Sequence, residues 1–156
     1  AAKVLAQFTE AQIRAAVEQG RYQDPRAVDY LVRTLRGRQE KLVRYWFAQV
    51  PPLDFFQLRD GVLVGQDLLV TRGYHDGQGV RYRSRLSLVD AERKGTLWTA
   101  WQDSAALRVD LRCAPPVTDR QPFLAVEMQV NRGDGWSRSV WAYLAPASGR
   151  LVAVTR

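Results

Sequence analysis

The chain has 156 residues, a hydrophobic fraction of 46%, a charged fraction of 25% and a formal net charge of +7. This length suits one domain or two small ones, and this composition is that of an ordinary globular protein. A single cysteine and a single histidine exclude an internal disulfide and any zinc or haem site built on several such ligands. No apolar run approaches the ~20 residues that span a membrane.

The positive charge comes from 23 Lys and Arg residues against 16 Asp and Glu residues. Such an excess permits binding to phosphate, anionic lipid or an acidic partner. The arginines are scattered along the chain, so the excess can equally reflect the base composition of the genome. The chain begins AAKVLAQF without an initiator Met, and we therefore expect a fragment or a processed form.

Two helices are expected first. Thr9 and Gln12 fit a capping box, which predicts a short helix over residues 10–19. Asp24 as N-cap and Pro25 at the first helical position begin a long helix, and the prolines at 51–52 end it, so we place it at about 25–49. Apolar residues at three- and four-residue spacings predict its inward stripe: Val28, Leu31, Val32, Leu35, Leu42, Tyr45 and Trp46.

The two halves of this stripe are expected to have different surroundings. Tyr45 and Trp46 should lie over a sheet, whereas Val28, Leu31 and Leu35 should be exposed or covered by residues 1–19 or a second copy of the chain. After the helix the hydrophobic period changes from that of a helix to that of short strands.

The expected strands are 55–59 and 62–64 around an Asp60-Gly61 turn, then 67–72, 80–89, 97–101, 107–112, 123–130, 139–144 and 151–155. Short strands at this spacing without intervening helices predict an antiparallel β-sandwich or open barrel. The fold class is therefore α+β, with a helical segment over 1–52 and a sandwich-like domain over 53–156.

An arginine stripe is the clearest electrostatic feature. Arg81, Arg83 and Arg85 should share one strand face about 6–7 Å apart, where they could bind phosphates or carboxylates, and Arg108 and Arg112 extend the stripe if the strands are neighbours. The alternative is an exposed sheet face on which these arginines pair with acidic side chains, namely Asp110, Glu92 or Glu127.

Aromatic residues suggest a second candidate surface. Trp141 and Tyr143 should share a strand face opposite Val140, Ala142 and Leu144, and a flat aromatic strip can stack sugar rings or bases. The alternative is that both faces of the sheet are covered, one by a second sheet and one by helices, so that the aromatics serve packing.

No sequence pattern indicates catalysis. His75 beside Asp76 could form part of an enzyme site, but the alternative is an exposed loop histidine. Walker and dinucleotide-binding motifs are absent from the sequence. The tripeptide Arg132-Gly133-Asp134 has the residues that a tight turn requires, and we interpret it as a turn. We assign no catalytic residue, no cofactor and no metal ligand.

The stretch FTEAQIRAAVEQGRYQDPRAVDYLVRTLRGRQEKLVRYWFAQVPPLDFF resembles part of a family of large, mostly uncharacterised bacterial proteins. The family pattern has a Phe-Thr-Asp/Glu start, an Ile-Arg-Ala helix, a Tyr-Ser-Asp-Pro link, and a Tyr-Leu…Leu…Arg-Arg-Asp-Lys helix before Pro-Leu-Asp. Here Gln23 replaces Ser, and Arg38-Gln39-Glu40-Lys41 stands at the Arg-Arg-Asp-Lys position. The last strands, AVEMQVNRGDGWSRSVWAYL and LVAVTR, also look like that family's ending.

In such relatives the region upstream looks kinase-like and holds the catalytic-looking motifs. The resemblance implies that residues 1–52 are the tail of a larger upstream domain and that 53–156 form an appended β domain. We therefore expect a non-catalytic accessory or interaction domain that binds the upstream part of its own polypeptide or a protein partner. The alternative is a ligand-binding β-sandwich for an anionic ligand (phosphate, nucleic acid or acidic glycan) or a carbohydrate. The cellular compartment and oligomeric state stay open.

Overall fold

The computed structural model describes residues 2–95 and 98–156, which form two compact units. The first, here called the helical unit, consists of the chain up to Pro52 together with Leu68–Asp76. The second, the sandwich unit, consists of Leu53–Asp67 and Gly77–Arg156. The chain therefore enters the sandwich unit for one β-hairpin, returns to the helical unit for nine residues, and then completes the sandwich.

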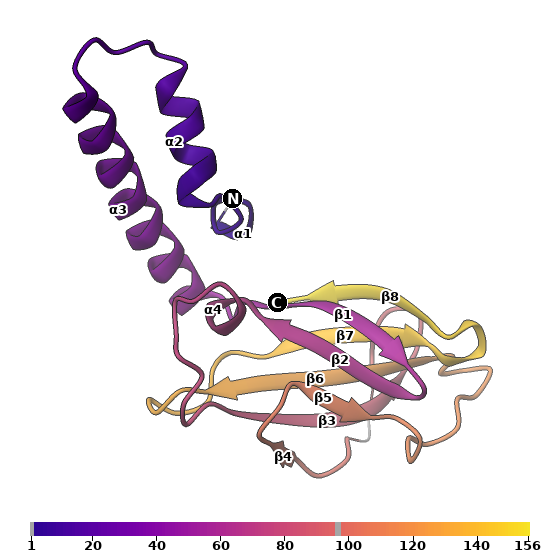
Figure 1. Cartoon of the computed structure of the whole chain (residues 1–156). Coiled ribbons are helices and arrows are strands. Elements are labelled where there is room, and N and C mark those ends of the chain that lie inside the picture. The colour runs from indigo at the N-terminus through magenta and orange to yellow at the C-terminus, as the bar shows by residue number, and fades with distance from the viewer. Residues whose placement is uncertain (1, 96–97) are drawn as a thin grey trace. The chain divides into compact units, whose positions relative to one another are not determined.

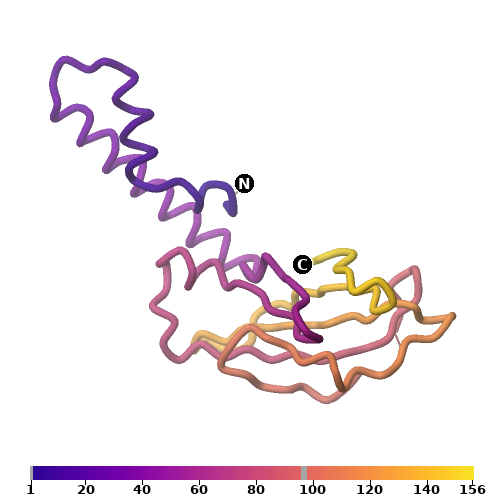
Figure 2. The backbone as a smooth tube through the Cα atoms, turned by 45° about the vertical axis from the view of Figure 1, so that its right-hand side comes forward, coloured from indigo at the N-terminus to yellow at the C-terminus, as the bar shows by residue number. Residues whose placement is uncertain are grey.

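The helical unit has four helices, α1 (Ala2–Leu5), α2 (Glu10–Glu18), α3 (Pro25–Gln49) and α4 (Leu68–Thr71). Figures 1 and 2 both show α2 running back alongside α3. The capping box that begins α2 is confirmed, because the Gln12 N–H donates to Thr9 Oγ1 at 3.3 Å and the Thr9 N–H donates to Gln12 Oε1 at 2.9 Å. Asp24 caps α3 by accepting from the Arg26 N–H at 2.9 Å, so the predicted bounds of α3 are also confirmed.

The buried face of α3 differs from the predicted stripe. Val43 and Phe47 form the core of the helical unit with Ala6 and Leu68. Gln39 is also buried and donates from Nε2 to the backbone carbonyls at the end of α1, including that of Phe8 at 2.9 Å. The residues of α3 that are buried are Val32, Gln39, Val43 and Phe47.

Three residues assigned to the inward stripe are therefore misplaced by the sequence pattern, because Leu42, Tyr45 and Trp46 are exposed. Leu35 is also exposed, which is one of the two outcomes expected for the first half of the stripe. Val28 and Leu31 are half-buried. The helix is apolar over a wider arc than its neighbours cover. The pattern of spacings alone does not indicate which part of that arc is covered.

The sandwich unit contains two antiparallel sheets, and among the described residues neither closes into a barrel. The three-stranded sheet has the order β1 (Leu53–Arg59), β2 (Val62–Asp67), β5 (Arg108–Asp110). The five-stranded sheet has the order β4 (Gln102–Ser104), β3 (Arg81–Val89), β6 (Phe123–Asn131), β7 (Val140–Ala145), β8 (Arg150–Thr155), with a short 3-10 helix at Pro146–Ser148. The predicted α+β class with an antiparallel sandwich is confirmed.

The core of the sandwich is built from apolar residues of its central strands, and β6 is buried without a break from Leu124 to Met128. On β6, Val126 and Met128 are fully buried, and they lie beside Val140 and Ala142 of β7. Leu53 and Leu63 of the three-stranded sheet are equally buried. Each such side chain contributes roughly 1.5–3 kcal/mol when removed from water. The other side of the five-stranded sheet then forms its outer face.

Two strand predictions differ from the structure. Residues 67–72 do not form a strand, because β2 ends at Asp67 and the apolar residues after it begin α4, where Leu68 joins the core of the helical unit. The predicted strand at 97–101 also differs. Its first residue lies outside the described part of the chain, and Trp98 makes only an isolated bridge to Ser87. The next strand, β4, begins at Gln102. The hairpin turn at Asp60-Gly61 is confirmed, with φ of 48° and 75°, as a type I′ turn requires.

Candidate functional site

The predicted arginine stripe lies on the outer face of the five-stranded sheet. Register along β3 and β6 places Arg83 opposite Gln129 and Arg85 opposite Glu127. The intervening β3 residues Tyr82 and Ser84 are buried on the other face. Arg81, Arg83 and Arg85 therefore share one face, as the alternation predicts.

Three tryptophans enclose two of these arginines. The Arg83 Cζ atom lies 4.3 Å from the ring centroid of Trp101 and 4.4 Å from that of Trp136. The Arg85 Cζ atom lies 4.5 Å from Trp101 and 4.9 Å from Trp98. These five residues form one alternating stack, Trp136, Arg83, Trp101, Arg85, Trp98, which we call the ladder. Each contact of this kind contributes about 0.5–2 kcal/mol, depending on its desolvation.

A hydrogen-bond network holds the Nε side of both guanidinium groups in place. Arg85 donates from Nε to Glu127 Oε2 at 2.6 Å, and Arg83 donates from Nε to Gln129 Oε1 at 2.8 Å. Glu127 and Gln129 are joined through Ser139, whose hydroxyl donates to Glu127 and accepts from Gln129 Nε2 at 2.9 Å. Glu127 is only 6% exposed, so its charge is stabilised by this pairing.

The outer fork (Nη1 and Nη2) of Arg85 is not used by this network, and that of Arg83 is used only in part, because Arg83 Nη2 also donates to Gln129 Oε1 at 2.5 Å. No hydrogen bond joins Nη1 of Arg83, or either Nη of Arg85, to another described residue. Among residues 2–95 and 98–156, the buried side-chain nitrogen or oxygen that lacks a partner is Arg132 Nε. The free Nη atoms of the ladder therefore reach solvent, which leaves two forks that can bind an anion bidentately.

The remaining predicted arginines lie elsewhere. Arg81 pairs with Asp103 of β4 at 2.7 Å and is exposed. Arg108 lies on β5 of the other sheet, so the condition for its joining the stripe is not met. Arg112 pairs with Asp110, and its hydrogen bonds hold the pKa of that carboxyl well below its usual range. Of the acidic partners predicted for the stripe, Glu127 pairs with Arg85 at 2.6 Å.

The predicted aromatic pair lies on the same outer face. Trp141 is opposite Glu127, and Tyr143 is opposite Ala125, while their neighbours Val140 and Ala142 are buried on the inner face. Both rings are half-buried, and the Arg93 Cζ atom lies 5.2 Å from the centroid of Tyr143. The pair is partly covered rather than fully open to a ligand.

A buried ion pair links the two sheets at the Arg132-Gly133-Asp134 turn. Arg132 contacts Asp67, the last residue of β2, at 2.5 Å, and the Tyr82 hydroxyl of β3 donates to the same carboxylate at 3.1 Å. Burial, and then the neighbouring Asp67 charge, raise the pKa of Tyr82 above its ordinary value. Arg132 therefore has a structural role in the interior of the sandwich.

His75 and Asp76 are the other residues that the sequence suggested for chemistry. His75 Nδ1 lies 3.3 Å from Asp76 Oδ1 in the helical unit. Within the described ranges 2–95 and 98–156, His, Cys, Asp and Glu side chains form no group of three or more that could hold a metal ion. The helices in these ranges also include none that is both long enough and apolar enough to cross a membrane.

The helical unit presents a second candidate surface on α3. We use the name α3 stripe for its exposed apolar residues Leu35, Leu42, Tyr45 and Trp46, which are 41%, 46%, 59% and 50% exposed. The Tyr45 and Trp46 rings meet edge to face, with centroids 5.4 Å apart. Such an edge-to-face pair holds both rings in a defined arrangement.

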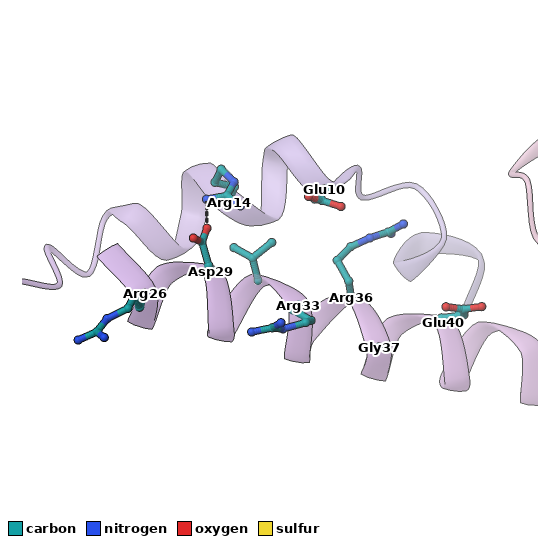
Figure 3. Close-up of a pocket in the computed structure, with 9 residues that line it drawn as sticks. Glu10, Arg14, Arg26, Asp29, Arg33, Arg36, Gly37 and Glu40 are labelled. Atoms are coloured by element: carbon teal, nitrogen blue, oxygen red, sulfur yellow. Dashed lines mark hydrogen bonds and ion pairs between the residues drawn. The ribbon is translucent and has the colours of Figure 1, made fainter. Parts of the chain in front are cut away.

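A polar groove of about 790 Å³ lies between α2 and α3. Figure 3 shows Arg14 of α2 facing Asp29 of α3, which pair at 2.8 Å, and this hydrogen bond raises the pKa of Arg14. Its charged lining residues are four arginines and three acids: Arg14, Arg26, Arg33, Arg36, Glu10, Asp29 and Glu40. The charges are mixed, so this groove favours neither anions nor cations.

Sequence reasoning missed how the tryptophans engage the arginines. Trp98, Trp101 and Trp136 come from the segment after β3 and from the β6–β7 turn, and the stacking depends on pairings such as Ser87 with Trp98 and Asn131 with Trp136. The sequence signal that could have indicated this stacking is a strand with three arginines together with tryptophans in the segments that follow β3 and β6. Comparisons with protein-family models, curated proteins and solved structures find no match to this chain.

Proposed function

We propose that this chain is a non-catalytic interaction module that binds an acidic amphipathic helix of a protein partner through the α3 stripe. The observation that carries the proposal is the exposure of two leucines and two large aromatic rings along one helix. Contiguous exposed apolar patches on soluble proteins are typical of interaction sites. Aromatic residues dominate the binding energy of such sites.

The geometry of the stripe suits a helical partner. At 100° per residue, Leu35, Leu42 and Trp46 fall within an arc of about 40°. Leu35 and Trp46 are eleven positions apart, which is roughly 17 Å along the axis at 1.5 Å per residue. This length corresponds to three turns, and a partner helix that packs its own apolar face here would place side chains at i, i+3/i+4 and i+7 spacings against it.

The charges beside the stripe specify the sign of the partner. Arg38 projects near the middle of the stripe and Lys41 beside it, and both side chains are exposed. Within residues 2–95 and 98–156, neither has an ion-pair partner, whereas nearby Arg44 pairs with Glu40 at 2.9 Å. A partner with Asp or Glu flanking its apolar face would complement Arg38 and Lys41, and the net charge of +7 would speed its association.

The test uses two synthetic amphipathic helices of about 18 residues with the same apolar face, one flanked by Glu and the other by Lys. Labelled peptide is titrated with the whole protein and followed by fluorescence anisotropy. The Glu peptide should bind, and the Trp46→Ser variant should weaken this binding roughly tenfold or more, as for an aromatic hot spot. Tyr30→Ser is the matched control, because Tyr30 is an exposed aromatic of α3 outside the stripe.

The proposal fails if both peptides bind equally, if Trp46→Ser binds as well as the unaltered protein, or if Tyr30→Ser has the larger effect. Concentration-dependent self-association that Trp46→Ser abolishes would instead assign the stripe to a second copy of the chain. Tight binding to anionic vesicles but to neither peptide would assign it to a lipid surface. Either result would overturn the proposed partner.

A further inference from the structure

We propose that the ladder is a binding site for an extended acidic peptide segment that has carboxylates at positions i and i+2. The site consists of the free guanidinium forks of Arg83 and Arg85, held between the three tryptophan rings. It lies in the sandwich unit, so it is distinct from the α3 stripe and does not depend on it.

The ladder keeps a positive charge after its internal pairing. Arg85 is paired with the buried carboxylate of Glu127, but Arg83 bonds to the neutral amide of Gln129. Two guanidinium groups thus meet one carboxylate, and the ladder keeps a net positive charge. Nη1 of Arg83 and both Nη atoms of Arg85 have no hydrogen-bond partner among the described residues, and Nη2 of Arg83 has a second N–H beside the one that Gln129 accepts, so an incoming carboxylate can form two parallel N–H···O bonds with a fork.

The two guanidinium groups are also preorganised. A free arginine side chain loses much rotamer entropy when it binds a ligand. Here Trp101 contacts both guanidinium planes, and Gln129 and Glu127 fix their side edges. The two forks therefore have their positions before a ligand arrives, which lowers the cost of binding.

The two arginines have the spacing of an extended chain. Arg83 and Arg85 are two positions apart on β3, so their side chains leave the strand at points roughly 6.6 Å apart on the same face. An extended peptide repeats its side chains on one side at the same interval of roughly 6.6 Å. Carboxylates at i and i+2 match both forks at once, whereas carboxylates at i and i+1 point to opposite sides and reach only one.

The stacking also argues against nucleic acid as the ligand. Bases bind single-strand sites by stacking on open aromatic faces. The Trp101 ring has Arg83 and Arg85 as its neighbours, with both Cζ atoms within 4.5 Å of its centroid. This ring is therefore occupied, and the ladder offers edge-on hydrogen-bond donors in place of an open stacking platform.

The experiment compares two peptides of identical composition by isothermal titration calorimetry with the whole protein. One repeats Glu-Thr, which places carboxylates at i and i+2; the other repeats Glu-Glu-Thr-Thr, which places them in adjacent pairs. The alternating peptide should bind roughly tenfold more tightly, the factor expected for one additional charge-assisted contact. This comparison uses the unaltered protein, so it does not depend on any variant folding.

Arg83→Lys and Arg85→Lys keep the net charge but replace the planar fork with a single ammonium group. Each should remove the preference for the alternating peptide, while near-ultraviolet circular dichroism verifies that the tryptophans keep their packing. Arg112→Lys is the matched control, because Arg112 is also ion-paired but is not part of the ladder and follows β5 of the other sheet. This control should bind both peptides as the unaltered protein does.

Equal affinity for the two peptides, or an unchanged preference in both lysine variants, would overturn the proposal. Tighter binding of a single-stranded oligonucleotide of equal charge would also overturn it, because the ligand class would then be wrong. Trp46→Ser should leave this binding unchanged. The failure of this inference is therefore distinguishable from failure of the function proposed for the α3 stripe.

Discussion

The buried pair of Arg132 and Asp67 gives the sharpest stability prediction. Asp67 ends β2 in the three-stranded sheet, and Arg132 follows β6 in the five-stranded sheet, so the pair joins the two layers of the sandwich. Their side chains are only 18% and 3% exposed. The Arg132→Met variant keeps most of the side-chain volume but leaves the Asp67 carboxylate buried without its cation.

Removing one partner of a buried ion pair costs about 3–5 kcal/mol, because the remaining charge is uncompensated. Tyr82 still donates to Asp67, so we expect a value near the lower end, about 3 kcal/mol. For a unit of this size that loss lowers Tm by roughly 12 °C or more. Urea denaturation followed by tryptophan fluorescence measures the free energy of unfolding of the sandwich unit.

Arg112→Met is the matched control, because Arg112 forms an exposed pair with Asp110. Such surface pairs contribute about 0–1 kcal/mol, and this variant should unfold almost as the unaltered protein does. An Arg132→Met variant that loses no more stability than Arg112→Met would refute the reasoning. It would mean that the Asp67 carboxylate is satisfied or hydrated without its arginine.

Three further predictions concern the sandwich unit. Its free energy of unfolding should fall by up to ~1.4 kcal/mol per pH unit above pH ~10. The reason is that burial beside Asp67 raises the pKa of Tyr82, so the folded state keeps a proton that the unfolded chain loses. Urea titrations at several pH values should show this slope reduced in Tyr82→Phe. Trp101→Leu should cost about 1–3 kcal/mol in urea denaturation, because it removes the ring that contacts both ladder arginines; a loss below that of Arg112→Met would count against the ladder. Gly65→Ala should lower the free energy of unfolding by about 1–3 kcal/mol, and with it Tm, because its methyl group would lie 2.5 Å from an atom of Phe56. An unchanged Tm would show that this ring moves freely.

The helices were predictable because their ends are determined locally. The caps at Thr9 and Asp24 and the prolines at 51–52 act within one turn of the chain, and the bounds of α3 follow from them. The covered face of α3 was not predictable in the same way. It depends on α1 and on Leu68, which is 21 residues or more along the chain from the core residues Val43 and Phe47 that it joins.

The sandwich was predictable for a similar reason, since alternation along β3, β6 and β7 separates an apolar face from a polar one. The segment after Asp67 has the composition of a strand, but Leu68 is buried in the helical unit, and that tertiary contact is compatible with a short helix. Composition cannot show which unit a segment joins.

The candidate site was likewise predictable only in its local part. The shared face of Arg83 and Arg85 follows from a period of two and needs no knowledge of other strands. Their stacking partners come from two separate segments of the sequence, since Trp98 and Trp101 follow β3 whereas Trp136 follows β6. Finding them requires the register of the sheet, which a single sequence does not provide.

The most direct test of the proposed function is a heteronuclear NMR titration of the whole protein with the Glu-flanked amphipathic helix. Amide resonances of residues 35–46 should shift in a saturable manner, and Trp46→Ser should abolish these shifts. The ladder residues Arg83 and Arg85 should keep their resonances, because the helical peptide does not present carboxylates at strand spacing. Shifts confined to the sandwich unit, or no saturable shift on α3, would contradict the assignment of the α3 stripe as the binding surface.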